Sequence, residues 1–209
     1  MTIGVLPDTM LREMIARGEI SAEPAISPEQ IQPASIDLRL GAVAYRVRAS
    51  FLAGKGARVA SRLPEFEMHR MDLNGGAVLE KGCVYLVPLM ESLALPEGIT
   101  AVANAKSSTG RLDLLTRLIT DEGVEFDRIP EGYQGPLYAE ICPRSFSVLV
   151  RPGMRLNQIR FRAGQATLSD AELKILHQQE PLVDGEAVID HGLGFSVDLR
   201  AREGDLVGY

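Results

Sequence analysis

The sequence predicts a mainly β protein, an antiparallel barrel or jelly roll with a short helix near each end of the domain. Short runs of β-favouring residues follow one another from Tyr45 to Phe161, and Gly and Pro residues separate them. Long helices do not alternate with these runs, which argues against a parallel sheet. Clear helix signals lie on either side of the β region.

The N-terminal helix is predicted in "LPDTMLREMIARGEI", where apolar residues share one face and Gly18 gives a stop signal. The C-terminal helix begins with a capping box, Ser169 with Glu172, in "SDAELKILHQQ". A short helical turn is expected around Ser107–Leu115. The predicted strands include Tyr45–Val47, Val84–Pro88, Ile99–Asn104, Leu137–Ile141, Phe146–Val150 and Leu156–Phe161.

A motif that precedes most of the predicted strands is repeated near the end of the chain. The first copy, "IQPASIDLRLG", spans Ile31–Gly41, and the weaker copy, "GLGFSVDLRA", spans Gly192–Ala201. A second copy after a complete β domain predicts a second repeat. We therefore expect a domain over residues 1–180, followed by a linker and the start of an incomplete repeat over 181–209, as part of a longer two-repeat protein.

Composition limits the classes of partner. The net charge of −6 over 209 residues argues against a nucleic-acid polymer, although a local cationic cluster could still bind a small anion. No apolar run approaches the roughly 18 residues of a spanning helix, so no membrane partner is expected. Cys83 and Cys142 lie in apolar segments and are interpreted as reduced core thiols, which predicts a cytoplasmic location.

The segment "NAKSSTGRLDL" is the best candidate for an anion site. It places Lys106, Ser107, Ser108 and Arg111 where a predicted strand meets a short helix. Two hydroxyls, backbone N–H groups and two cations suit an oxyanion or a phosphate. The alternative, equally open from the sequence, is that one serine only caps the helix and the cations are solvated.

A second candidate site lies in "RIPEGYQGPLYAEICP", a turn followed by a strand. Alternation places Glu140 on one face with Tyr138 and Cys142. A carboxylate withdrawn from water there could act as a general base, whereas a solvent-facing Glu on a half-covered sheet is the equally weighted alternative. In the third segment, "RPGMRLNQIRF", Gln158 lies mid-strand and could contact a base or only a ladder neighbour.

Several catalytic motifs are missing from the sequence. The three histidines, His69, His177 and His191, lie far apart, and neither cysteine has a partner at ligand spacing. Local motifs therefore predict no zinc site of the deaminase type. The sequence also lacks a Walker loop, a dinucleotide fingerprint and a G-x-S-x-G elbow.

In this order, "QPASIDLRLG", "KSSTGRL", "RIPEGYQGPLYAEI" and "RPGMRLNQIRF" resemble the dCTP deaminases of the dUTPase-like superfamily, over roughly Ile31–Phe161. The second "SVDLR" resembles the start of the second half of the fused, double-length family members. The resemblance implies a dUTPase-like barrel of distorted jelly-roll type and a trimer or trimer-like homo-oligomer with active sites between subunits. It further implies dCTP and dUTP as ligands, Mg²⁺ with the triphosphate and no zinc.

The resemblance also implies roles for particular residues. Glu140 matches the general base that activates water against C4 of cytosine, and Ser107 and Arg111 match residues that bind and polarise the base and the water. Asp37 matches a structural Asp. The substrate-binding residues implied in this way are Lys106, Ser108, Arg128, Tyr133 and Gln158.

Two departures from the family pattern concern the phosphate side and the base-reading hairpin. Lys106 stands where the family has an Arg, and a lysine supplies the charge but not the planar guanidinium that donates two parallel hydrogen bonds. The segment between Arg111 and Arg128, which includes "TDEGVEFD", is longer than in compact relatives, so its base-reading residues cannot be matched.

Three alternatives to a dCTP deaminase that supplies dUTP for thymidylate synthesis remain at this stage. A dUTP pyrophosphatase needs a carboxylate in the turn, where this chain has Pro130 with Glu131 beside it. A bifunctional deaminase and diphosphatase would need Glu131 to replace that carboxylate. A non-catalytic structural or nucleotide-sensing repeat would have little reason to retain Ser107, Arg111 and Glu140 together.

Overall fold

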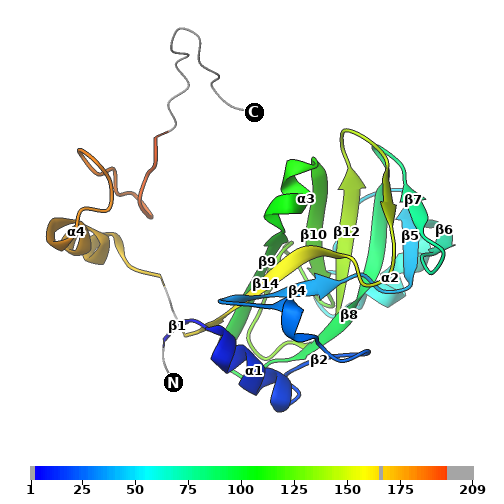
Figure 1. Cartoon of the computed structure of the whole chain (residues 1–209), viewed down its shortest axis with the longest axis horizontal. Coiled ribbons are helices and arrows are strands. Elements are labelled where there is room, and N and C mark those ends of the chain that lie inside the picture. Colours follow the sequence, from blue (N-terminus) through cyan, green and yellow to red (C-terminus); the bar gives the residue numbers. More distant parts are fainter. Residues whose placement is uncertain (1–2, 165–166, 197–209) are drawn as a thin grey trace, which may run out of the picture. The chain divides into compact units, whose positions relative to one another are not determined.

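The computed structural model describes residues 3–164 and 167–196 of the chain (Figure 1). It divides into two compact units, Met1–Gln165 and Ala166–Tyr209. The described strands, β1 to β14, belong to the first unit, and helix α4 belongs to the second.

The first sheet has the strand order β11-β9-β14-β4-β3, with β1 paired to the end of β14. All of its pairings are antiparallel. β14 therefore lies between β9 and β4 (Figure 1). The bounds of these strands are β1 Gly4–Val5, β3 Ile31–Gln32, β4 Ser35–Arg39, β9 Ile99–Ala105, β11 Arg128–Ile129 and β14 Arg155–Ala163.

The second sheet has the order β10-β12-β8-β5-β6, with β2 paired to the far part of β8. A separate two-stranded ribbon is formed by β7 and β13. The bounds are β2 Ile20–Ala22, β5 Val43–Val47, β6 Glu67–Asp72, β7 Ala77–Leu79, β8 Val84–Ala94, β10 Leu114–Thr120, β12 Gln134–Pro143 and β13 Val148–Val150.

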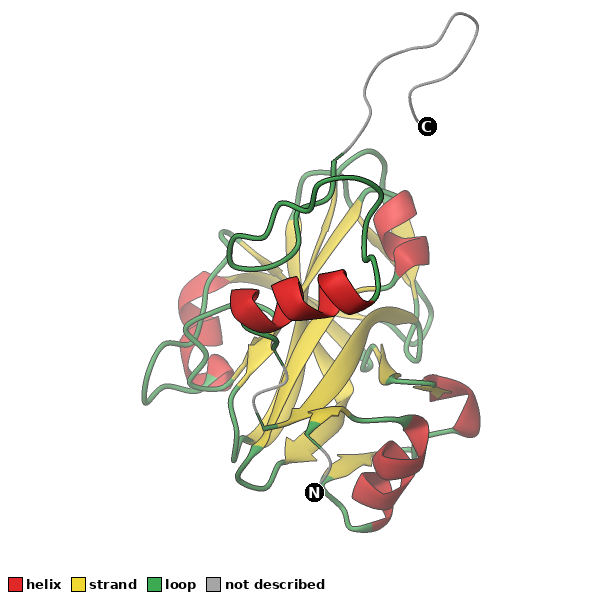
Figure 2. Cartoon of the chain, turned by 90° about the vertical axis from the view of Figure 1, so that its left-hand side faces the viewer, coloured by secondary structure: helices red, strands yellow, loops and turns green. Residues whose placement is uncertain are grey.

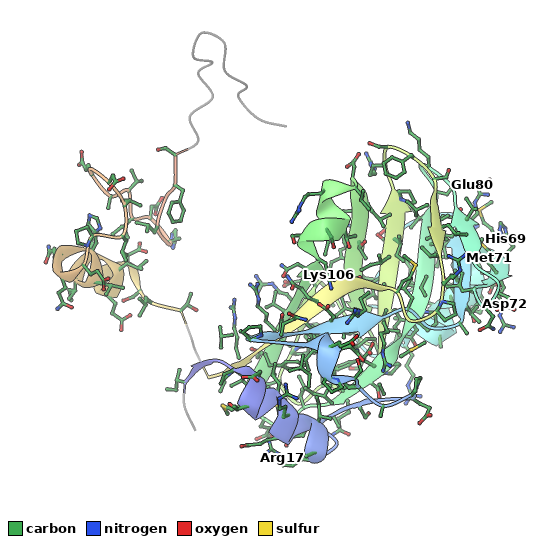
Figure 3. The ribbon with its side chains drawn as sticks, in the orientation of Figure 1. Arg17, His69, Met71, Asp72, Glu80 and Lys106 are labelled. Carbon is green, nitrogen blue, oxygen red and sulfur yellow. The ribbon has the colours of Figure 1, made fainter. Side chains whose placement is uncertain are left out.

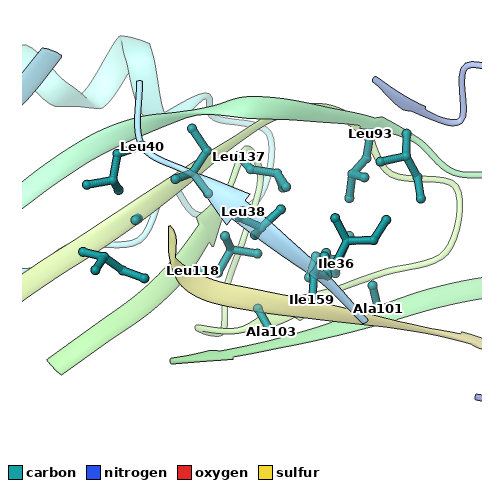
Figure 4. Packing of buried hydrophobic residues seen from close by; sticks show 14 of the residues in the cluster. Ile36, Leu38, Leu40, Leu93, Ala101, Ala103, Leu118, Leu137 and Ile159 are labelled. Carbon is teal, nitrogen blue, oxygen red and sulfur yellow. The ribbon is translucent and has the colours of Figure 1, made fainter. Parts of the chain in front are cut away.

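The main core lies between the two sheets and draws alternate residues from each. Ile36, Leu38, Ala103 and Ile159 come from the first sheet, and Leu118 and Leu137 come from the second (Figure 4). Each of these six side chains is almost completely buried. Alternation along the strands thus produces the two inward-facing apolar surfaces of a sandwich.

The prediction of a mainly β domain is confirmed, whereas a closed barrel does not form (Figure 2). The two ladders stay separate, and the first sheet ends on β11 and β3, which have two residues each. Strands this short leave few unpaired backbone groups at the edge, so the sheet needs no closure to protect it.

The predicted helices are present. They are α1 Asp8–Ala16, α3 Ser107–Arg111 and α4 Asp170–Gln179, and α4 has the predicted capping box. The structure adds α2 Val59–Phe66 and a 3₁₀ turn, Pro28–Gln30, neither of which was predicted. The helical turn predicted up to Leu115 was too long, because β10 begins at Leu114.

The motif "SIDLR" forms β4, and its polar residues are bound within the first unit. Glu91 of β8 is 1% exposed and accepts hydrogen bonds from the Arg39 backbone N–H (2.8 Å), Arg39 Nε (2.8 Å) and Gln30 Nε2 (2.9 Å). Arg39 Nη2 also donates to the Pro24 carbonyl at 2.6 Å. The motif therefore ties the two sheets together through a buried, fully paired carboxylate.

The second half of the second motif copy, residues 197–201, lies outside the described residues. Both cysteines are free thiols: Cys142 is buried and Cys83 is half-buried against the core. Within the described chain, no helix has the length and apolar character needed to cross a membrane.

Candidate active site

The start of α3 carries the cationic and hydroxyl residues predicted from the sequence. Lys106 is the N-cap residue, with extended backbone, and no side chain caps the helix. The structure thus does not support the alternative in which a serine only caps this helix. Arg111 Nη2 instead donates to Ser107 Oγ at 3.3 Å, one helical turn away. Ser107, Ser108 and Arg111 are all exposed, so their polar groups are open to a ligand or to a neighbouring chain.

Lys106, labelled in Figure 3, points at the motif Ile31–Gly41. Its ammonium Nζ donates to Asp37 Oδ2 on β4, and the Asp37 side chain is 3% exposed. Gln158 lies opposite Asp37 in the β14–β4 ladder and opposite Asn104 in the β14–β9 ladder. Three residues predicted from the sequence therefore lie close together, on adjacent elements of the first sheet. They are Lys106, which directly follows β9, Asp37 on β4 and Gln158 on β14.

Glu140 lies in the middle of β12, and its side chain is 4% exposed. Of the two alternatives left by the sequence, this supports the carboxylate withdrawn from water. Its partner is Arg117 of β10, which is directly opposite in the ladder. Arg117 Nε donates to Glu140 Oε1 at 3.1 Å, and Nη2 donates to the same oxygen. The carboxylate is therefore oriented and held by a single cation.

A second apolar cluster covers the strand face that carries Glu140. Tyr138 and Ile119 on that face pack with residues of the segment between β5 and β6, which contains α2. The members from that segment include Phe51, Ala53, Val59, Leu63 and Phe66. Burial raises the pKa of Tyr138 to about 12, with the nearby Asp121 carboxylate adding to the shift. The surroundings of Glu140 are thus poor in water on its own chain.

A cavity of about 870 Å³ lies at the far end of β10. It is lined by the segment Thr120–Glu125 and the turn Ile129–Pro136, with Arg58 and Arg162 on other sides. Arg128 and Tyr133, both predicted to bind substrate, belong to its wall. Thr120 Oγ1 and Arg162 Nε are buried there without a hydrogen-bond partner among the described residues.

Tyr133 shapes this cavity from within the chain. Its hydroxyl donates to the Pro136 carbonyl at 2.6 Å and accepts from the Asp121 N–H at 3.2 Å. A Cβ on Gly135 would lie 2.8 Å from that hydroxyl, so Gly is required where the ring folds over the turn. Burial raises the pKa of Tyr133 well above its usual range. The ring therefore holds the turn against the Thr120–Glu125 segment.

Asp127 is a further carboxylate near Arg117 and Glu140. Its Oδ1 accepts from the Leu118 N–H at 2.7 Å, and its backbone has a φ of 63°. Burial raises the pKa of Asp127, the hydrogen bond and Arg117 lower it, and the charge of Glu140 raises it again. The charge of Arg117 thus acts on both carboxylates.

The predicted residues occupy three places along the β10–β12 ladder. The α3 cluster adjoins Leu114 at one end, Arg117 and Glu140 lie in the middle, and the cavity adjoins Thr120 at the other end. At a strand rise of about 3.4 Å per residue, Arg117 is about 10 Å beyond Leu114. No hydrogen bond or ion pair among the described residues joins Glu140 to Ser107 or Arg111. Nor does the described part of the chain contain three or more His, Cys, Asp or Glu residues grouped to hold a metal ion.

Sequence reasoning missed Arg117, Phe126 and Ser50. Arg117 Nη2 donates to Ser50 Oγ at 3.0 Å, and its guanidinium carbon lies 3.7 Å from the centre of the Phe126 ring. The alternation in "LLTRLIT" places Arg117 on the same face as Ile119, which was an available signal. Its pairing with Glu140 depends on the hairpin register, which the long insertion between the strands concealed.

The comparisons with known proteins agree on one family. The model of the 2'-deoxycytidine 5'-triphosphate deaminase (DCD) N-terminal domain matches residues 2–165. A dCTP deaminase from Haloarcula marismortui is 28% identical over 167 residues, which cover 75% of this chain and 79% of that protein. A dUMP-forming dCTP deaminase from Aquifex aeolicus is 31% identical over 164 residues, 75% of this chain and 80% of that protein.

A solved structure is similar over nearly the whole chain. The crystal structure of 2'-deoxycytidine 5'-triphosphate deaminase from Agrobacterium tumefaciens superposes with a TM-score of 0.86 at 54% sequence identity. The match covers 95% of this chain but only 60% of the Agrobacterium chain. The present chain therefore corresponds to somewhat more than half of that protein.

Proposed function

The chain belongs to the dCTP deaminase family, and from this premise we propose that it catalyses the hydrolytic deamination of dCTP to dUTP and ammonia. The observation that carries the proposal is Glu140, a carboxylate buried in the middle of a strand, held by Arg117 and surrounded by an apolar cluster. A buried, oriented carboxylate is the group that such a reaction needs to move protons.

The proposed chemistry assigns one step to each part of the ladder. Glu140 takes a proton from water as the water oxygen bonds to C4 of cytosine. It then gives this proton to N3. The proton of the new C4 hydroxyl passes to the exocyclic amine, the C4–N bond breaks, and ammonia leaves as C4 becomes a carbonyl. Ser107 and Arg111, already 3.3 Å apart in α3, hold the water and the base by hydrogen bonds and stabilise the developing charge.

The triphosphate is assigned to the α3 cluster and the nucleoside to the cavity. Lys106 and Ser108 supply a cation and a hydroxyl to the phosphates, with Gln158 alongside. The cavity of about 870 Å³, with Arg128 and Tyr133 in its wall, takes the sugar and base. Mg²⁺ is proposed to arrive with the nucleotide and to neutralise part of the triphosphate charge; no zinc is assigned a role.

The proposed site is completed by a second copy of the chain. Glu140 and the Ser107–Arg111 pair do not contact each other in one chain, whereas the catalysis requires them around one base. The exposed polar side of α3 supports a site shared between neighbouring subunits, in a trimer or a trimer-like assembly. The cytoplasm is the proposed place of action, with dUTP supplied for thymidylate synthesis.

The proposed product is dUTP, although several relatives carry names that specify dUMP formation. The turn has Pro130 where a pyrophosphatase needs a carboxylate. Glu131, the neighbouring carboxylate, accepts a hydrogen bond from the Gly98 N–H at 2.8 Å and is thereby bound within the chain. This leaves no free carboxylate in that part of the turn to direct water at the α-phosphate.

Ammonia release and nucleotide analysis on the purified chain test the proposal. Incubation with dCTP and Mg²⁺ should release ammonia and dUTP in equal amounts, without pyrophosphate. Formation of dUMP would show a bifunctional enzyme. Binding of dCTP without any turnover would support a nucleotide-sensing repeat instead.

A further inference from the structure

Arg117 does more than neutralise a buried charge, because its contacts select one oxygen of Glu140. Nε at 3.1 Å and Nη2 both reach Oε1. Among the described residues Oε2 receives no hydrogen bond, and it is not one of the fully buried atoms left without a partner. One carboxylate oxygen is therefore occupied and the other is available to a water molecule.

The guanidinium is itself held on its other sides. Nη2 also donates to Ser50 Oγ at 3.0 Å, and the planar group stacks on the Phe126 ring at 3.7 Å from its centre. An Arg over an aromatic face gains cation–π attraction in a fixed orientation, which a flexible ammonium does not match. Phe126 belongs to the insertion between β10 and β11, whose earlier residues line the cavity.

We infer that Arg117 is a positioning residue for the deamination: clamped by Phe126 and Ser50, it holds Glu140 by Oε1 and directs Oε2 at the water that attacks the base. The inference rests on the proposed function and deepens it. It assigns Phe126 a supporting role, because its ring holds the cation that orients Glu140.

The chemistry explains why such a clamp is needed. The last torsion of a Glu side chain is broad, so an unheld carboxylate rotates freely, whereas productive geometry tolerates roughly 10–20°. In the reaction, a water proton moves to Oε2 while the C4–O bond forms. The proton then leaves Oε2 for N3, the proton of the new C4 hydroxyl passes to the exocyclic amine, and ammonia departs as the C4–N bond breaks. Arg117 stays protonated throughout and exchanges no proton.

Arg117→Gln removes the cation and the clamp, and Arg46→Gln is the matched control. Arg46 lies on β5 of the same sheet, pairs with Glu80 at 2.9 Å, and has a side chain 29% exposed, against 30% for Arg117. Steady-state kinetics with dCTP, calorimetric dCTP binding and the melting temperature would be measured for each variant.

We expect Arg117→Gln to lower kcat by about 10²-fold while KM and dCTP binding change by less than about threefold, since ground-state contacts are retained. Arg117→Lys should restore part of kcat, because charge returns without the fork. Phe126→Leu, which keeps the whole Glu140–Arg117 pair, should also lower kcat more than KM. Arg46→Gln should match the wild type.

The outcomes separate this inference from the proposed function. If the wild-type chain deaminates dCTP and the Arg117→Gln variant is equally active, the inference about Arg117 is overturned and the proposed function stands. An Arg117→Gln variant whose KM rises while kcat stays constant would also overturn the inference. If Arg117→Gln does not fold, an unchanged kcat in Phe126→Leu would overturn it. A wild-type chain that turns over no dCTP would overturn both.

Discussion

Lys106 and Asp37 form an ion pair between two motifs of the predicted site, Asn104–Leu114 and Ile31–Gly41. Lys106 immediately precedes α3, and Asp37 lies in the middle of β4, 69 positions earlier in the sequence. The Asp37 side chain is 3% exposed and that of Lys106 is 26% exposed. The motif Ile31–Gly41 therefore positions Lys106, the cation of the proposed phosphate site. This explains why a strand so apolar carries an Asp at its centre.

We predict that Lys106→Met raises KM for dCTP about tenfold or more and leaves kcat within a few-fold, because a phosphate contact acts equally on the ground and transition states. The melting temperature should also fall, since Asp37 loses its cation in a buried place. Lys81→Met, at an exposed turn position, is the control. Unchanged KM in Lys106→Met would remove Lys106 from substrate binding and leave it a structural residue.

We predict that Glu140→Gln abolishes turnover while dCTP binding persists. Gln preserves the shape and can still accept from Arg117, but it cannot take a proton from water. Loss of general-base catalysis costs about 10²–10⁴-fold, and more when the same group also delivers the proton. Steady-state turnover and calorimetric binding would be compared with the wild type. A variant with near-normal turnover would exclude Glu140 as the general base.

Much of the β framework could be predicted because its signals are local. Alternation along β12 correctly assigned Leu137, Ala139 and Ile141 to the main core and left Tyr138 and Glu140 on the opposite face. That assignment left open whether Glu140 faced water or was withdrawn from it. Whether the opposite face was wet depended on the segment containing α2, which packs from a distant part of the chain. Its helix was missed because Pro64 lies inside it and the pattern is short.

The partners of the predicted residues were harder to find, because they depend on register and on contacts across the sheets. Glu91 gave no signal, since a single Glu in a strand is indistinguishable from a surface residue until Arg39 and Gln30 are placed beside it. The closed barrel was expected from the spacing of the strands and from family resemblance, but local strand signals cannot tell whether two sheets join. The cavity likewise depends on Tyr133 folding over Gly135.

We predict that turnover depends on Mg²⁺ and persists without zinc. Lys106 is the one cation assigned to the triphosphate, which leaves charge for a divalent cation to neutralise. Removing all divalent ions with EDTA should therefore raise KM strongly. Adding Mg²⁺ should restore turnover, and a zinc-selective chelator should have no effect. Activity lost to that chelator and recovered with zinc alone would contradict the proposed chemistry.

We predict that two inactive variants complement each other in a mixed oligomer. Ser107→Ala and Glu140→Gln damage the two sides of a shared site. At equal amounts about one quarter of the sites in a randomly mixed assembly should combine an intact Glu140 with an intact Ser107. Co-expression followed by dCTP assays would measure this, with the double variant mixed with each single variant as the inactive control. Recovery of no activity, or a monomer by light scattering that turns over dCTP, would show that one chain forms the whole site.

We predict that Asp127 makes the stability of the β unit depend on pH in the mildly acidic range. Burial raises the pKa of Asp127 above its ordinary value of 3.8, so the folded state favours the protonated form. An acid whose pKa is higher in the folded state contributes stability that is present below the unfolded pKa and is lost as pH rises through the folded pKa.

The variant Asp127→Asn tests this directly. Asn can accept from the Leu118 N–H as Asp does, and it tolerates the positive φ of 63°. It should therefore melt at a higher temperature than the wild type at pH 7, with the difference shrinking as pH falls towards 3.8. Urea unfolding of both proteins from pH 3.5 to pH 7 would measure the difference in unfolding free energy, and Asp72→Asn, at an exposed position on β6, is the control. The prediction fails if the difference in unfolding free energy between Asp127→Asn and the wild type stays constant with pH, or if the variant is the less stable protein at pH 7. Burial would then not be the dominant influence on the pKa of Asp127.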